Sequence, residues 1–590
     1  MRKYLWLFIL FANIGILGAA APTTTESNKT VEQLHSIFSD YSRYQKQRFP
    51  SVEHPDKDMR KGGFRDISEA GFQKHQAKLD GFLQRLTEID YSELSEDEKI
   101  NTDMFRFNVT SEINDIIFDK HLFPMEGDTG FYFDLLRLGD ITLIKNEQDA
   151  LFYIEKLESI PDFLHQWQLN LKRAVAINKV MPAIVLVDFE KPLEKLINDK
   201  ASENPLAKPL QQLSKALPEK QAEHLTKRAL QAINNNVQPA VKSFIQFLVQ
   251  DYLPHGRDSI AIEQIKDGRQ FYQSQIKYYT TLNLSADEIH NIGLSEVRRI
   301  RAEMDKVIEA SGFEGNFEQF IHYLRTDPQF YASSAEELLK EAAYISKKMD
   351  GKLPKFFSKL PRQPYGVEPV PDAIAPRYTT GRYVGAPLDS HRSGTYWVNT
   401  YALNKRPLYV LEALTLHEAV PGHHLQNALT KELSNLPKFR RDSYLSAYGE
   451  GWALYCEKLG IEAGFYQDPY SQFGRLTYEM WRAIRLVVDT GMHSKGWSRE
   501  KAIKFMEQNT ALSKHNVRTE IDRYIAWPGQ ALSYKMGEIK IVELRKKAEK
   551  ALGQSFDIRA FHDEILANGP VTLGILERQI NRWIERQLTK

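Results

Sequence analysis

The sequence is poor in cysteine and has almost no net charge, and each feature excludes a class of protein. Among the 590 residues there is one cysteine, Cys456, so no intramolecular disulfide can form and the fold must be held by burial and hydrogen bonds. Cys456 stands among apolar neighbours, which predicts a buried structural thiol rather than a nucleophile. Basic residues number 78 and acidic residues 77, so no overall field points to nucleic acid or to a charged membrane surface.

Long apolar runs are also absent after the N-terminus, as are internal repeats and low-complexity tracts. At the start, Arg2 and Lys3 precede "YLWLFILFANIGILGAAA", which predicts a signal peptide over residues 1–21 with cleavage near Ala20 or Ala21. We therefore expect a periplasmic or secreted protein with no stable membrane insertion after cleavage. The alternative is an uncleaved anchor, because the run is only slightly short for a span. No cysteine follows the run, which excludes lipid attachment at that point.

Helical patterning dominates the rest of the chain, which is long enough for a large core. A helix is predicted after Ser285, whose side chain can cap it together with Glu288, and Gly312 is expected to stop it. Between about residues 353 and 407 the composition shifts to Pro, Gly and aromatic residues, and the segment "GTYWVN" favours a strand.

These patterns predict a mainly α protein with a large, two-lobed, peptidase-like helical fold. A helical N-terminal region over residues 22–352 and a catalytic region over residues 353–590 are expected to form one integrated unit. The short β region precedes a helix that begins near Pro407. By analogy with zinc peptidases, its strand is expected at a sheet edge, where it could pair with an extended peptide. The alternative is a strand that only caps the core.

Chemistry is concentrated in "LTLHEAVPGHHLQNAL", residues 414–429. In the common zinc-peptidase signature, two histidines four residues apart lie on one helical face, about 6 Å apart along the axis. The glutamate after the first histidine takes a proton from the metal-bound water. Here His417 and Glu418 fit the first half of that pattern, but the later histidines stand six (His423) and seven (His424) residues after His417.

Neither later histidine suits one metal ion on an undistorted helix. His423 would lie about 120° off the face of His417, and His424 roughly 10 Å along the axis. Pro421 and Gly422 offer a means of distortion, because proline breaks the helical ladder and glycine tolerates unusual φ values. A two-residue bulge after Val420 would make His423 the second ligand and leave His424 beside it or facing substrate. The opposite assignment, with His424 as the ligand, stays open at this point.

A third ligand is expected in "SAYGEGWALYCEKLG", where Glu450 and Glu457 stand seven residues apart on one helical face. Gly449 and Gly451 flank Glu450 and would permit close approach of backbone and metal. A carboxylate in such apolar surroundings is costly unless it is paired or metal-bound. Glu450 is the predicted ligand, and Glu457 is interpreted as a solvated or salt-bridged residue.

The stretches "SGTYWVNT", "HEAVPGHHLQ", "YGEGWALYCEKLG", "DTGMH" and "RYIAWPGQALSYKMG" together resemble a bacterial family catalogued as domain of unknown function 885. The resemblance covers most of the mature chain, and the family in turn looks like a distant relative of gluzincin-type helical zinc peptidases. It implies His417, His423 and Glu450 as ligands of one zinc ion per chain, and Glu418 as general base. The inserted Pro-Gly pair departs from the gluzincin signature.

Further groups are needed to stabilise the oxyanion that forms when water attacks a carbonyl. His493 and Tyr534 are candidates for that catalytic role, with a structural hydrogen bond as the alternative for each. Arg523 and Lys535 could bind a carboxylate of the substrate, which would suit an exopeptidase.

The leading hypothesis is a zinc metallopeptidase that hydrolyses short peptides. Zinc is the expected cofactor, although manganese or cobalt could occupy the same ligands. The expected partner is a peptide substrate and not nucleic acid; the sequence does not determine the oligomeric state. One alternative is a metal-dependent hydrolase of another amide or ester, because the ligand set does not define the leaving group. Another is a non-catalytic peptide-binding protein, although binding alone would not need Glu418.

Overall fold

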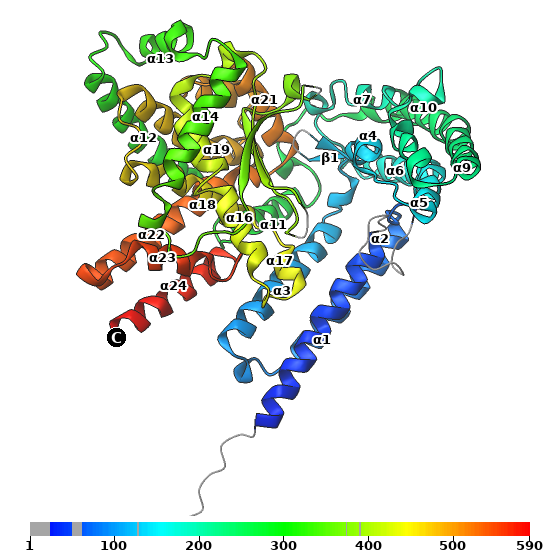
Figure 1. The fold of residues 1–590 in the computed structure, drawn as a ribbon, viewed down its shortest axis with the longest axis horizontal. Coiled ribbons are helices and arrows are strands. Elements are labelled where there is room, and N and C mark those ends of the chain that lie inside the picture. The colour runs from blue at the N-terminus through cyan, green and yellow to red at the C-terminus, as the bar shows by residue number, and fades with distance from the viewer. Residues whose placement is uncertain (1–23, 50–61, 127–128, 373, 389–390, 590) are drawn as a thin grey trace, which may run out of the picture.

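The computed structural model describes residues 24–49, 62–126, 129–372, 374–388 and 391–589. The fold is mainly α, with a larger body and a smaller helical lobe, as Figure 1 shows. The predicted signal peptide, residues 1–21, lies outside the described residues. None of the described helices combines the length and the apolar character that a membrane span requires.

Three helices at the N-terminus connect the two bodies. They are α1 (Thr24–Arg48), α2 (Glu69–Thr87) and α3 (Glu96–Ile117). Side chains cap two of them, because Ser68 Oγ accepts the Gly71 N–H of α2 and Ser95 Oγ accepts the Glu98 N–H of α3. In Figure 1, α1 and α2 run side by side toward the smaller lobe.

Within the described residues, the smaller lobe contains seven α-helices, and the longer ones bury one apolar face each. They are α4 (Tyr132–Ile141), α5 (Glu147–Glu158), α6 (Ile160–Ala176), α7 (Lys191–Glu194), α8 (Leu213–Ala216), α9 (Glu219–Ala232) and α10 (Gln238–Phe247). Two antiparallel strands of two residues each precede them: β1 (Met125–Glu126) and β2 (Thr129–Gly130).

Four helices return the chain to the larger body: α11 (Gly268–Thr280), α12 (Ala286–Ala310), α13 (Phe317–Thr326) and α14 (Ala335–Asp350). The predicted capping box of α12 is confirmed: Ser285 Oγ accepts the Glu288 N–H, and the Glu288 carboxylate accepts the Ser285 N–H. Gly312, with φ +69°, follows the end of α12 as predicted.

A three-stranded sheet covers the helix that carries His417. Its strands are β3 (Tyr365–Pro369), β4 (Gly381–Val384) and β5 (Gly394–Val398), in the order β3-β5-β4. The predicted strand is therefore present as β5, but its expected edge position is wrong. β5 is paired on both sides, parallel to β3 and antiparallel to β4, because the preceding Pro- and Gly-rich segment supplies two further strands.

Ten helices complete the larger body. They are α15 (Leu411–Glu418), α16 (His423–Glu432), α17 (Lys438–Arg441), α18 (Ser446–Glu462), α19 (Pro469–Ser494), α20 (Arg499–Glu507), α21 (Lys514–Ala526), α22 (Ser533–Leu552), α23 (Ile558–Leu566) and α24 (Leu573–Leu588). Pro407 precedes a short 3₁₀ turn and not the first turn of α15 itself. From Phe473 to His493, α19 is buried at every position except Trp481, so it forms the centre of this body.

Apolar side chains gather in two large clusters. One lies in the larger body and combines α1–α3 and α12–α14 with the sheet and the C-terminal helices. The other fills the smaller lobe and includes Ile67 and Phe72 near the start of α2. The first cluster draws residues from both sides of residue 353, so the exact boundary between the two predicted regions stays a prediction.

Candidate metal centre

The Pro-Gly pair ends one helix and starts another. α15 stops at Glu418 and α16 begins at His423, so the expected bulge within a single helix is in fact a break between two. The connection folds back tightly: the Gly422 N–H donates to Leu416 O at 3.0 Å, and the Trp452 indole N–H donates to Pro421 O at 2.9 Å. A Cβ atom at residue 422 would lie 1.9 Å from His417 O, which is why glycine is required there.

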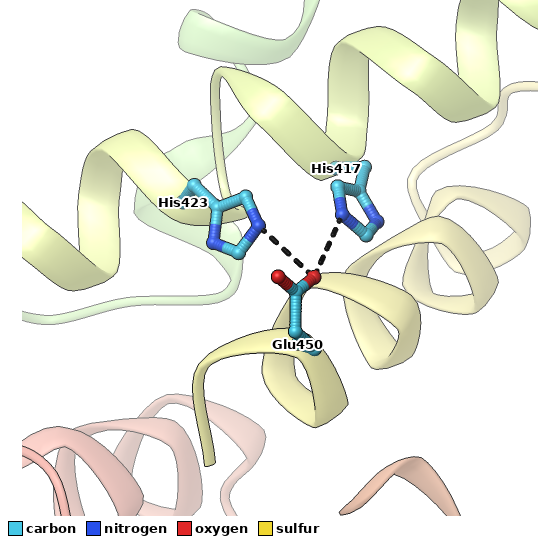
Figure 2. Close-up of side chains that lie close together, drawn as sticks. All are labelled: His417, His423 and Glu450. Atoms are coloured by element: carbon cyan, nitrogen blue, oxygen red, sulfur yellow. Dashed lines mark ion pairs between the residues drawn. The ribbon is translucent and has the colours of Figure 1, made fainter. Parts of the chain in front are cut away.

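This break brings His417, His423 and Glu450 together, as Figure 2 shows. Glu450 Oε2 lies 3.4 Å from Nε2 of His417 and 3.4 Å from Nε2 of His423. One ligand atom of each residue lies within 4.8 Å of the other two. Three of the four predicted ligands therefore converge, and they come from α15, α16 and α18.

His417 has a carboxylate on each side. Its Nδ1 lies 2.8 Å from Glu457 Oε1, while Nε2 faces Glu450. Burial lowers the pKa of His417, but hydrogen bonds to Glu450 and Glu457 outweigh burial and raise it to about 10. The sequence predicts that Glu457 is either solvated or salt-bridged. It is buried and paired with His417, so the salt-bridged environment is the one found. It orients the ring of His417, as carboxylates commonly do for metal-binding histidines.

Glu450 is held from the opposite side by a tyrosine. Tyr444 OH donates a hydrogen bond to Glu450 Oε1 at 3.1 Å, which leaves Oε2 for the two histidines. Burial raises the pKa of Glu450, but His423 and His417 outweigh burial and hold it well below its usual value. The Glu450 side chain keeps 15% of its surface exposed, so the centre is not fully closed.

Glu418 lies next to His417 in sequence and is oriented by the sheet. Its Oε2 accepts the backbone N–H of Tyr383 in β4 at 2.7 Å. Since β4 is an edge strand, this N–H points away from β5 and is free to hold the carboxylate. Tyr383 could not be predicted from the sequence, because its contact with Glu418 depends on the order of the strands.

His424 does not join the cluster, and its prediction as a metal ligand is corrected. Its Nδ1 lies 3.2 Å from Tyr383 OH, and its ring packs against Tyr365 at 4.6 Å between centroids. Burial lowers the pKa of His424 to about 4, which favours the neutral ring. The break at Pro421 directs His423 toward Glu450, and the next residue on α16 consequently faces the sheet.

His493 is also placed elsewhere, and its prediction as an oxyanion donor is corrected. It is fully buried in α19, where Nδ1 accepts the Ile262 N–H and Nε2 donates to Tyr524 O at 3.0 Å. Both ring nitrogens are therefore used in structural hydrogen bonds. Burial lowers the pKa of His493 to about 4.

Tyr534 stays a prediction. It is half-buried, and the Arg485 guanidinium stacks 4.2 Å from its ring centroid. Burial lowers the pKa of Arg382 in β4, but Tyr378 above all, and then Glu418 and Tyr534, outweigh burial and raise it. Tyr534 thus lies in the electrostatic surroundings of the proposed base.

The two predicted substrate-binding cations are engaged within the protein. Lys535 is 0% exposed and forms ion pairs with Glu296, Glu479 and Glu538, so its predicted role is corrected. Arg523 is half-buried and contacts Glu520 and Gln530. Cys456 is buried and free, as expected for a structural thiol.

The glycines beside Glu450 pack helices rather than approach a metal. A Cβ atom at Gly451 would lie 2.5 Å from Gly537 Cα of α22, and one at Gly449 would lie 2.7 Å from the ring of Tyr444. The predicted close approach of backbone and metal is therefore replaced by close approach of α18 to its neighbours. Tyr444, six residues before Glu450, carried no sequence signal of its own.

Comparisons with known proteins give a family and a fold. The model of the family described as "Bacterial protein of unknown function (DUF885)" matches residues 54–580. Two solved structures share the architecture, and both are described as a "putative lipoprotein". The one from Colwellia psychrerythraea has 29% identity and a TM-score of 0.82 over 95% of this chain and 99% of that one. The other, of unknown function from Shewanella oneidensis, has 18% identity and a TM-score of 0.68 over 95% of this chain and 100% of that one, and shows the fold alone. No match was found among curated proteins.

Proposed function

The chain belongs to the bacterial family DUF885, and from its histidine–glutamate cluster we propose that it is a zinc-dependent peptidase. The proposal goes beyond the family description, which names no activity. Its support comes from the geometry of His417, His423 and Glu450 and from the position of Glu418 beside them.

The observation that carries the proposal is the distance from Glu450 Oε2 to Nε2 of each histidine, in a cluster whose ligand atoms all lie within 4.8 Å of one another. In a tetrahedral zinc site with bonds of about 2.0–2.1 Å, neighbouring ligand atoms lie about 3.3–3.4 Å apart. Glu450 Oε2 lies 3.4 Å from Nε2 of both histidines, which matches this spacing and is longer than a good hydrogen bond. The donor set of two imidazoles and one carboxylate also fits zinc, and three protein ligands leave a coordination position for water or substrate.

Each residue of the site then has a definable role. When bound, zinc supplies a Lewis acid that polarises the scissile carbonyl and lowers the pKa of water. Glu418, held by the Tyr383 N–H, accepts a proton from the attacking water and later donates it to the leaving amine. Glu457 orients His417, and Tyr534 is the proposed donor to the oxyanion.

Access to the centre favours short peptides over folded proteins. The side chains of His423 and Glu450 expose 11% and 15% of their surface, so an extended chain could reach them more easily than a folded domain. We also propose an extracytoplasmic location, periplasmic or secreted, which is supported by the lipoprotein descriptions of the two similar structures and by the predicted signal peptide.

The first experiment is elemental analysis of the purified mature protein after loosely bound ions are removed. We expect about one zinc per chain, as one cluster can hold one ion, and a large loss of zinc in His423→Ala and Glu450→Ala. His424→Ala is the matched control, because it lies one residue from a ligand and should retain the metal. Absence of zinc in the wild type, with no uptake when zinc is supplied, would contradict the proposal.

Measurement of turnover tests whether the protein hydrolyses peptides. Glu418→Gln should keep the zinc and lose peptide hydrolysis by a factor of roughly 100 or more, because general base catalysis typically contributes that much. Peptides should be compared with esters and other amides of similar size. A preference for a non-peptide substrate would favour another metal-dependent hydrolase.

A further inference from the structure

A large cavity adjoins the candidate metal centre. It has a volume of about 760 Å³ and lies between α1, α3 and the segment 438–445. Tyr444 forms part of its wall and donates its hydroxyl hydrogen to Glu450. Tyr444 is 51% exposed, and this one residue contacts both the cavity and the proposed ligand.

Every carboxylate on the wall of this cavity has a basic or histidine partner among the described residues. Lys120 forms ion pairs with Asp115 at 3.3 Å and with Glu126 at 3.0 Å. Lys438 pairs with Asp442, and His75 lies 3.3 Å from Glu112. Lys120 and Lys438 therefore compensate only part of this negative charge, while the five lysines and arginines that line the cavity outnumber its four carboxylates by one.

Three further cations line the same wall. Lys46, Arg48 and Arg65 line the cavity, and the described part of the chain offers none of them an ion pair. The guanidinium groups of Arg48 and Arg65 each lie 5.2 Å from the ring centroid of Phe49. Among the described residues, Glu112 and Asp66 act on Arg48, and Asp134 and Glu126 act on Arg65, without forming an ion pair with them. Two half-buried arginines around one ring therefore favour the binding of a further anion.

A neutral donor and apolar surfaces accompany these charges. Trp167 is 7% exposed, and its indole N–H has no hydrogen-bond partner among the described residues. Phe131 stacks on Trp167 at 4.5 Å between centroids, and Phe72 also lines the cavity. The wall thus combines an excess of positive charge with aromatic surface, which suits a peptide that carries both a carboxylate and an apolar side chain.

We propose that this cavity is the substrate-recognition site of the proposed peptidase, where Arg48 and Arg65 bind a carboxylate of the peptide. The inference rests on the proposed function for the reaction but names the feature of the peptide that is recognised. The carboxylate is either the C-terminus of the peptide or an acidic side chain, and both present the same planar pair of oxygens to a guanidinium group. The structure assigns this role to Arg48 and Arg65 in place of Arg523 and Lys535.

Two pairs of short alanine-rich peptides with one phenylalanine test the assignment. The first pair differs only in a C-terminal carboxylate or amide; the second is amidated throughout and differs only in one Glu or Gln. The wild type should show a kcat/KM roughly tenfold to hundredfold higher for the charged member of at least one pair, the range expected for a charge-assisted hydrogen bond. The pair that responds identifies the source of the carboxylate.

Variants of the two arginines then test whether they cause the preference for the charged peptide. Arg48→Gln and Arg65→Gln should bring the ratio of kcat/KM within the responsive pair close to one, because the charged member loses its additional contact. Arg43→Gln is the matched control, since Arg43 lies on the same helix with an exposed side chain and pairs with Asp40. Equal kcat/KM within both pairs for the wild type, or an unchanged ratio in both variants, would overturn the inference.

Binding separates this inference from the proposed function. Titration calorimetry with Glu418→Gln measures affinity without turnover, and the charged peptide should bind roughly tenfold or more tightly than its uncharged partner. If the wild type hydrolyses no peptide but this difference is found and is lost in Arg65→Gln, the peptidase proposal fails and the recognition site stands. If peptides are hydrolysed but both members of each pair bind equally, the recognition site fails and the peptidase proposal stands.

Discussion

Glu457 illustrates how one residue gains a role from its three-dimensional neighbours. Seven residues along a helix separate Glu450 and Glu457 by about 10 Å, too far for both to bind one ion. His417 lies between them, with Nε2 toward Glu450 and Nδ1 toward Glu457. Both carboxylates therefore act on the proposed centre, one directly and the other through the histidine ring.

At this scale we predict that Glu457→Ala weakens zinc binding by about tenfold to a hundredfold, the usual effect of removing the residue that orients a metal-binding histidine. Competition with a zinc chelator measures the affinity. Glu462→Gln is the control, because it lies on the same helix but pairs with Arg545 at the surface. Equal zinc affinity in the wild type and Glu457→Ala would show that His417 is positioned by other contacts.

Among whole elements, the crossing of α18 and α22 determines where Glu450 lies. The two helices approach so closely that a Cβ atom at Gly537 would lie 2.0 Å from Ala447 O. Gly451, the residue after Glu450, faces Gly537 across the same contact. Any separation of the two helices would therefore move Glu450 relative to the histidines on α15 and α16.

We predict that Gly537→Ala lowers the free energy of unfolding by about 1–3 kcal/mol, as overpacking of a tight contact does. It should also reduce zinc affinity, because Glu450 is displaced. The control is Gly81→Ala in α2, where a new Cβ atom meets nothing within 4 Å. That change should raise stability by about 0.5–1 kcal/mol through helix propensity. Urea denaturation of both variants is the measurement, and a neutral Gly537→Ala would contradict the proposed tight contact.

Across the whole molecule, two buried neutral histidines join segments that are distant in sequence. His493 connects α19 to Ile262 and Tyr524, as described above. His562 lies 2.9 Å from Phe356 O and 2.7 Å from Tyr455 OH. Burial lowers the pKa of His493 to about 4 and that of His562 to about 3.

These lowered pKa values predict acid sensitivity. The unfolded chain binds protons at these histidines below about pH 6.5, whereas the folded protein does not until about pH 4 or 3. The free energy of unfolding should therefore fall as pH decreases from about 6.5, by about 1.4 kcal/mol per pH unit for each histidine, until its folded pKa is reached. Above about pH 6.5 these two residues contribute no pH dependence.

The measurement is urea denaturation at several pH values between about 6.5 and 5, where carboxylates with lowered pKa contribute little. His493→Gln should show a slope smaller by about 1.4 kcal/mol per pH unit, whatever its absolute stability. His322→Gln, at an exposed position of α13, should keep the wild-type slope. An identical slope in His493→Gln would show that His493 does not resist protonation in the folded protein.

Local features of the fold were predictable from sequence because they depend on neighbours along the chain. Apolar periodicity indicated a mainly α protein, and Ser285 with Glu288 and Gly312 marked the two ends of α12. The aromatic and β-branched run indicated the strand β5. The residue types of the candidate site could also be predicted, since His417, Glu418, His423 and Glu450 follow from the chemistry of zinc ligands and a general base.

Only the tertiary structure decided which of these side chains meet. His423 and His424 are adjacent in sequence, but the helix break at Pro421 directs one toward Glu450 and the other toward Tyr383. His493 forms a hydrogen bond and Lys535 an ion pair with residues far away in the chain. The sheet order that makes β5 central and lets β4 hold Glu418 is equally non-local. The physical reason is the same in each case: a side chain's role depends on burial and on partners that packing brings from distant segments, and a single sequence does not encode those distances in its local pattern.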